Sequence, residues 1–92
     1  MTPRVIRNLT EAFLISKVLE AKRNGKVDFI LPELLGSDWP DECKPFYTMY
    51  GNEKTAGCEM GKLLGKVGRV LGLKMQKEDR RGKKDAITRY FI

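Results

Sequence analysis

The sequence contains no histidine and only two cysteines, Cys43 and Cys58, among its 92 residues. Without histidine, the most frequent general base and metal ligand of proteins is missing. Two cysteines are too few for a zinc finger or a disulfide framework. We expect both to be free buried thiols, and one disulfide between them is the alternative. These absences favour a protein that is not an enzyme and uses neither a cofactor nor a metal.

Long apolar runs are also absent, because charged residues interrupt every apolar segment well before it could span a bilayer. The start of the chain shows no signal-peptide pattern. We therefore expect a cytoplasmic protein without a membrane partner. A chain of 92 residues is the size of one small domain, so we expect residues 1–92 to form a single unit.

The first part of the chain lacks net charge, and the excess of positive charge lies entirely in the second part. Residues 1–58 contain eight basic and eight acidic side chains, whereas residues 59–92 contain ten basic and four acidic side chains. The formal charge of +6 is therefore confined to residues 59–92. Such segregation is typical of proteins that neutralise phosphate groups, although a basic surface can also serve solubility alone.

The segment from Ala56 to Leu71 has the apolar spacing of an amphipathic helix. Its apolar positions, which share one side, are Met60, Leu63, Leu64, Val67, Val70 and Leu71. Thr55 is a suitable N-cap, and Gly72 suits the left-handed position after the last turn. Lys62, Lys66 and Arg69 fall together, away from the apolar stripe. The pattern predicts a helix that presents a basic row outward.

Four glycines occupy one flank of this predicted helix: Gly57, Gly61, Gly65 and Gly68. Each glycine costs about 1 kcal/mol relative to alanine in a helix interior, so the missing side chains must serve a purpose. The flank could pack closely on a neighbouring helix, approach a nucleic-acid backbone, contact a partner protein or form a homodimer contact.

After Gly72 the apolar period changes from 3.6 to 2, which predicts a β-hairpin. The first strand begins at Leu73 and the second runs from Ala86 to Ile92, where β-branched and aromatic residues are frequent. The turn between the strands contains Gly82 and four basic residues, Arg80, Arg81, Lys83 and Lys84. A charged turn is often only solvated, but this one follows a helix with a basic row, which favours phosphate contacts.

The N-terminal half predicts a helix, a strand and a short second helix. Residues 1–7 form a short basic arm, either frayed or reaching into a groove. Asn8 and Glu11 have capping-box spacing, and Leu9 to Arg23 follows as an amphipathic helix. The apolar positions of this helix are Ala12, Leu14, Ile15, Val18, Leu19 and Ala21. Lys26 to Ile30 fits a strand that pairs with the hairpin, and Leu31 to Leu35 fits a helix between Pro32 and Gly36.

The connection from Ser37 to Lys54 is the hardest part to interpret. Pro40 and Pro45 argue against one continuous helix, and we expect helical turns at Asp41 to Lys44 and Phe46 to Tyr50. Its aromatic residues, together with Trp39, are expected to close the core. Stacking of Tyr47 or Tyr50 on bases is the alternative. Asp38, Asp41 and Glu42 could hold a cation, but adjacent acids of this kind are usually solvated.

The run from Phe29 to Gly36 followed by Trp39, the run from Thr55 to Leu64, and the end at Arg89-Tyr90-Phe91 resemble small phage winged helix-turn-helix proteins. The chain is also similar to the C-terminal winged-helix domain of virus and phage primase-helicases. The resemblance implies an α+β winged helix-turn-helix with three helices, a small antiparallel sheet and a C-terminal hairpin wing. It also implies double-stranded DNA binding in a bacterial host cell. The long connection over 37–54 departs from the tight turn of this family.

Two functional hypotheses follow. In the first, the chain is a DNA-binding regulator or accessory factor whose third helix and wing contact the duplex. The expected nucleic-acid contacts are Lys62, Lys66, Arg69, Lys74, Arg80, Arg81, Lys83 and Lys84. In the second, the same fold is a protein-interaction module, such as a phage inhibitor or adaptor of a host nucleoprotein complex that acts in anti-defence. Binding to random duplexes discriminates between the two.

Overall fold

The computed structural model describes residues 2–36, 40–79 and 86–92. In this part of the chain, four α-helices and one short 3-10 helix combine with a small antiparallel sheet. The expected α+β class is therefore confirmed, whereas the expected number of three helices is wrong. The helices are α1 (Pro3–Arg23), α2 (Leu31–Leu35), α3 (Lys44–Tyr50) and α4 (Glu53–Val70), and η1 (Asp41–Cys43) precedes α3. The strands are β1 (Asp28–Ile30), β2 (Lys74–Asp79) and β3 (Ala86–Phe91).

Helix α1 begins at Pro3, so the expected basic arm over residues 1–7 is wrong. Proline suits the first turn, where its missing N–H has no intrahelical acceptor, and the Thr2 hydroxyl accepts a hydrogen bond from the Val5 N–H at 3.3 Å. Asn8 therefore lies inside the helix and does not cap it. Arg4 and Arg7 belong to the first two turns of α1 and are held at fixed positions along it.

The buried side of α1 also differs from the expected one. Leu14 and Val18 are buried as expected, whereas Ala12 is exposed and Leu19 keeps 46% of its surface exposed. The buried position that the apolar pattern missed is Thr10, whose hydroxyl donates to the Ile6 carbonyl at 2.8 Å. This intrahelical bond satisfies the hydroxyl and allows a polar side chain to face the core.

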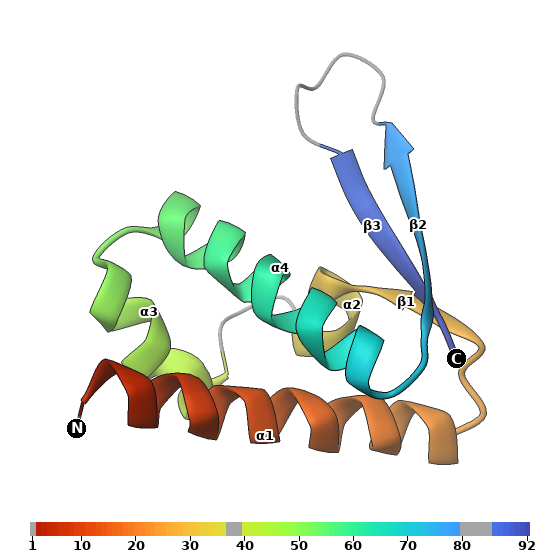
Figure 1. The fold of residues 1–92 in the computed structure, drawn as a ribbon, viewed down its shortest axis with the longest axis horizontal. Helices are drawn as coiled ribbons and strands as arrows, with labels where there is room; N and C mark the ends of the chain where they lie inside the picture. Colours follow the sequence, from red (N-terminus) through yellow and green to blue (C-terminus); the bar gives the residue numbers. More distant parts are fainter. Residues whose placement is uncertain (1, 37–39, 80–85) are drawn as a thin grey trace.

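The three strands form one antiparallel sheet in the order β1-β3-β2. As expected, the first strand pairs with the hairpin: Phe29 lies opposite Tyr90, and Met75 lies opposite Tyr90 on the other side. The Phe29 and Tyr90 rings stack with centroids 5.4 Å apart. The hairpin of β2 and β3 projects beyond the helices, with its base beside the C-terminal end of α4 (Figure 1).

The core lies between the helices and the base of the sheet. Its buried members are Leu14, Val18, Phe29, Cys43, Phe46, Met60, Leu64, Val67 and Tyr90. Leu34 and Leu35 of α2 are half-buried against this cluster. Trp39, which was expected in the core, lies outside the described residues. No helix in the described ranges has both the length and the apolar character needed to cross a membrane.

The two helical turns expected within 37–54 are present as η1 and α3, and Pro45 stands in the first turn of α3. Phe46 is buried, and its ring meets that of Tyr50 edge-on with centroids 5.0 Å apart. Phe46 and Tyr50 of α3 thus close the core beside α1 and α4, which agrees with the structural role expected for the aromatic residues of this segment. Gly51, with a φ of 77°, then reverses the chain into α4.

Candidate nucleic-acid interface

Helix α4 is the central element of the candidate interface, and it begins earlier than the apolar pattern predicted. Asn52, not Thr55, is the N-cap, because its side-chain oxygen accepts a hydrogen bond from the Thr55 N–H at 2.8 Å. Met60, Leu64 and Val67 are buried as expected. Val70 is 67% exposed, so its assignment to the buried stripe is wrong. The helix ends as predicted, with Gly72 at a φ of 75°.

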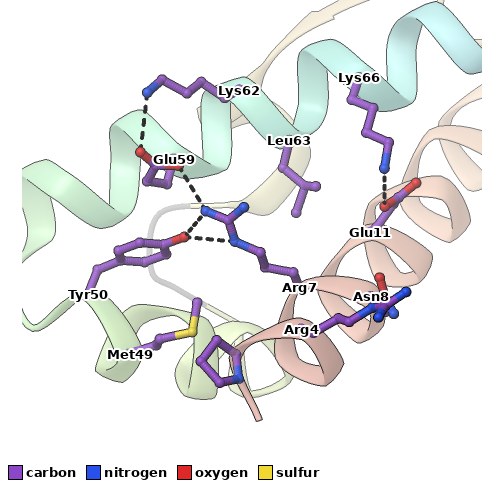
Figure 2. Close-up of a pocket in the computed structure, with 11 residues that line it drawn as sticks. Arg4, Arg7, Asn8, Glu11, Met49, Tyr50, Glu59, Lys62, Leu63 and Lys66 are labelled. Atoms are coloured by element: carbon purple, nitrogen blue, oxygen red, sulfur yellow. Dashed lines mark hydrogen bonds and ion pairs between the residues drawn. The ribbon is translucent and has the colours of Figure 1, made fainter.

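The expected basic row of α4 is divided between two directions. Lys66 Nζ lies 3.2 Å from a carboxylate oxygen of Glu11 on α1, so this lysine leans toward α1 (Figure 2). Lys62 Nζ lies 3.2 Å from Glu59 Oε1 on its own helix, and its side chain is 75% exposed. Arg69 is exposed further along the helix. Only Lys62 and Arg69 therefore remain on the outer face of α4.

The hairpin supplies further basic residues beside α4. Lys74 is exposed at the start of β2, and so is Lys77, which was not among the expected contacts. Met75 and Tyr90 face α4, and Lys77 lies two residues beyond Met75 on the same side of the strand. The register of the strand therefore turns Lys77 toward the side occupied by α4, whereas the expected contact Lys74, next to Met75, lies on the opposite face of the sheet. The expected contacts Arg80, Arg81, Lys83 and Lys84 lie outside the described residues.

The glycine flank of α4 meets the sheet at one end only. A Cβ on Gly68 would lie 3.3 Å from two ring carbons of Tyr90 and 3.6 Å from the Met75 sulfur. A Cβ on Gly65 would lie 4.0 Å from the Tyr90 hydroxyl, and one on Gly57 or Gly61 would meet nothing within 4 Å. Close packing therefore explains Gly68, but its neighbour is a strand, not the expected helix. Gly57 and Gly61 leave bare backbone on the hairpin side.

The electrostatics at the base of the hairpin follow from burial. The Tyr90 side chain is only 3% exposed, and this burial raises the pKa of its phenol, whereas the positive charge of nearby Arg69 lowers it. Arg89 is not available for an outer surface, because it pairs with Asp28 at 3.4 Å and with Glu33 at 3.7 Å. Arg89 is therefore held by ion pairs within the protein, whereas Lys74 and Lys77 of the same sheet are exposed.

A second concave surface lies between α1, α3 and α4. This groove has a volume of about 740 Å³. Its cationic side chains come from α1 and α4, and they are Arg4, Arg7, Lys62 and Lys66. Tyr50 closes one end, where its hydroxyl accepts a hydrogen bond from Arg7 Nε at 3.0 Å (Figure 2). Spacing along the sequence could not predict this groove, because the groove depends on how three separate helices pack.

The cysteines and the acidic residues are the remaining candidates for a catalytic or metal-binding role. Cys43 is buried as expected, but Cys58 is exposed, and both thiols are free. Asp41 pairs with Lys44 at 2.7 Å, and this bond lowers the pKa of the carboxyl. Asp38, the third acid of the expected cluster, lies outside the described residues. Within residues 2–36, 40–79 and 86–92, no group of acids and cysteines is arranged to hold a metal ion.

Comparison of the chain with protein-family models, with curated proteins and with solved structures gave no significant match.

Proposed function

We propose that this chain is a winged-helix protein that binds double-stranded DNA through the outer face of α4 and the hairpin. The observation that supports this most directly is the strand order β1-β3-β2. By pairing with β1, strand β3 anchors the base of the hairpin beside α4, so Lys77 of β2 lies on the side that α4 occupies. In a winged helix, the third long helix enters the major groove and the hairpin contacts the flanking backbone; here α4 takes the place of that helix.

The charges that remain available support a phosphate-binding surface. Among the described side chains, none forms an ion pair with Arg69, Lys74 or Lys77. Lys62 is held only by an exposed pair, which is worth at most about 1 kcal/mol and is readily exchanged for a phosphate. Gly57 and Gly61 would let a phosphate backbone approach α4 closely. Phosphate contacts of this kind give affinity, and base-edge contacts give specificity.

Few side chains on α4 are able to read bases. Lys62 and Arg69 are the candidates on its outer face, and Lys66 would first have to leave Glu11. A protein with many phosphate contacts and few base contacts should bind most duplexes with similar affinity. The proposed role is therefore that of an accessory or regulatory DNA-binding protein with modest sequence preference. The phage setting rests on the resemblance of the sequence.

The test is fluorescence anisotropy of a labelled random DNA duplex titrated with the protein at several salt concentrations. Single-stranded DNA and duplex RNA are titrated in parallel. If Arg69, Lys77 and the four basic residues of the turn each contact a phosphate, the logarithm of the affinity should fall with the logarithm of the salt concentration at a slope of roughly −5. The absence of duplex binding at low salt would overturn the proposal.

A further inference from the structure

The groove between α1, α3 and α4 is a second surface, which borders the outer face of α4 at Lys62 and includes no residue of the hairpin. Its walls are the first three turns of α1, the end of α3 and the middle of α4 (Figure 2). The apolar part of its lining includes Leu63 and Met49, which are half-buried against the core and face the groove. Amphipathic peptide segments commonly bind with their apolar side in an open, apolar groove between helices.

The charged side chains around this apolar lining carry a net positive charge. Four cationic residues and two acidic residues line the groove. Arg4 forms no ion pair with a described side chain and is exposed at the start of α1. The excess is therefore two positive charges, and at least one of them is free to meet a ligand. A segment that carries both carboxylates and apolar side chains complements this surface.

The two acids of the groove show where ligand carboxylates could be placed. Glu59 lies 3.3 Å from Arg7 and 3.2 Å from Lys62, so one carboxylate joins α1 to α4 across the groove. Glu11 holds Lys66 in the same way from the opposite wall (Figure 2). These pairs are partly exposed, so a carboxylate of a partner can compete for the same cations at a small cost.

We infer that this groove binds an acidic, amphipathic segment of a partner protein. Its carboxylates would pair with Arg4, Arg7 and Lys62, and its apolar side chains would cover Leu63 and Met49. A nucleic-acid strand is the poorer fit, because its continuous row of phosphates would be repelled by Glu11 and Glu59. A peptide can place a few carboxylates beside the cations and apolar groups elsewhere. This inference does not depend on the proposed binding of DNA.

The experiment uses a fluorescein-labelled peptide in which pairs of Asp or Glu alternate with Leu and Phe, titrated with the full chain. One matched peptide carries Asn or Gln at every acidic position, and another carries Ser at every apolar position. We expect both matched peptides to bind at least roughly tenfold more weakly than the acidic amphipathic peptide, because each lacks one of the two complementary features.

Two variants of the protein test the location of binding in opposite directions. Arg4→Glu should weaken peptide binding roughly fivefold, since it reverses one exposed charge at the groove. It should leave the fold intact, because an acid in the first turn of a helix interacts favourably with the helix dipole. Glu59→Gln should strengthen binding roughly two- to fivefold by releasing Arg7 and Lys62. The control is Lys26→Glu, which makes the same charge change outside this groove.

Three outcomes would overturn the inference. Equal binding of the neutral matched peptide would show that charge plays no part. Equal effects of Arg4→Glu and Lys26→Glu would show that only the net charge of the chain matters. If Arg4→Glu abolished the binding of a DNA duplex and left peptide binding unchanged, the groove would belong to the nucleic-acid surface. Retained duplex binding in Arg4→Glu, with weakened peptide binding, would support two separate surfaces.

Discussion

At the scale of single residues, the glycines of α4 differ in what surrounds them, although they look equivalent in the sequence. Gly68 fits against the Tyr90 ring, and Tyr90 is itself stacked on Phe29 and cannot move away easily. Gly61 faces open space on the same flank. Helical spacing placed both residues on one flank, but only the packing of the sheet shows which of them is needed for the fold.

Alanine substitutions should separate these two kinds of glycine. Gly61→Ala should raise the free energy of unfolding by about 0.5–1 kcal/mol, because alanine favours the helix and its Cβ meets nothing. Gly68→Ala should lower it, since the Cβ would crowd Tyr90 at 3.3 Å. Urea denaturation of both variants measures the difference. A stabilising Gly68→Ala would show that the Tyr90 ring can shift. Weaker DNA binding by the stabilised Gly61→Ala variant would indicate that this flank contacts the duplex.

Cys43 links burial to the pH dependence of stability. Burial in the core, together with the negative charge of Glu42, raises the pKa of the Cys43 thiol from 9.0 to about 11. Between these two values the unfolded chain releases the thiol proton while the folded chain keeps it. The stabilisation that the protonated Cys43 thiol gives to the folded state is therefore fully present below pH 9. It is lost as the pH rises toward about 11, and the free energy of unfolding falls by on the order of 1 kcal/mol per pH unit in this range.

The measurement is urea denaturation between pH 8 and 10.5, with Cys43→Ala as the control. This variant is expected to be less stable near neutral pH, because it leaves a small void in the core. Its stability should fall less steeply above pH 9, since the remaining titrating groups are common to both proteins. Parallel stability curves for the two proteins would contradict the assignment of Cys43 to the core.

At the scale of secondary-structure elements, most of the fold was predictable from periodicity. The change of period after Gly72, the short strand before Pro32 and the helix over Ala56 to Leu71 all correspond to observed elements. The predictions failed at helix starts. Helix α1 begins at Pro3 and α4 begins at Glu53, both earlier than the apolar pattern suggests. Capping depends on local hydrogen bonds, whereas periodicity reports only burial.

The start of α4 offers a direct comparison of the predicted and observed caps. Asn52→Ala should lower the free energy of unfolding by about 1 kcal/mol, because the Thr55 N–H would lose its acceptor. Thr55→Ala should change stability by less than about 0.5 kcal/mol, since Thr55 is exposed inside the helix, where alanine is favoured. Thermal and urea denaturation of both variants decide the matter. A larger loss in Thr55→Ala would restore the cap predicted from the sequence.

The candidate surfaces were predictable only in part, for a related reason. Helical spacing identified Lys62, Lys66 and Arg69 as outward-facing, but the partner of Lys66 is Glu11, 55 residues earlier in the chain. Lys77 became a candidate through its register with Thr88 and its position two residues after Met75. Contacts between distant segments decide where a long cationic side chain points, and spacing within one segment does not contain that information.

At the scale of the whole molecule, the sheet places the base of the hairpin beside α4, which brings Lys77 of β2 to the side of the helix that carries Arg69. If the location of charge matters more than its amount, two variants with equal net charge should differ. Arg69→Gln combined with Lys77→Gln removes two exposed cations from the proposed interface. Lys22→Gln combined with Lys26→Gln removes two exposed cations at and just after the C-terminal end of α1.

The first double variant should bind a random DNA duplex more weakly at every salt concentration, and its salt slope should be less steep by roughly 1.8, which corresponds to two lost phosphate contacts. The second should keep nearly the slope of the parent protein, because long-range attraction alone is screened within about 10 Å at 0.1 M salt. Anisotropy titrations at several salt concentrations provide both slopes. Equal losses in the two variants would mean that duplex binding follows the net charge of the chain, and α4 and the hairpin would no longer define the interface.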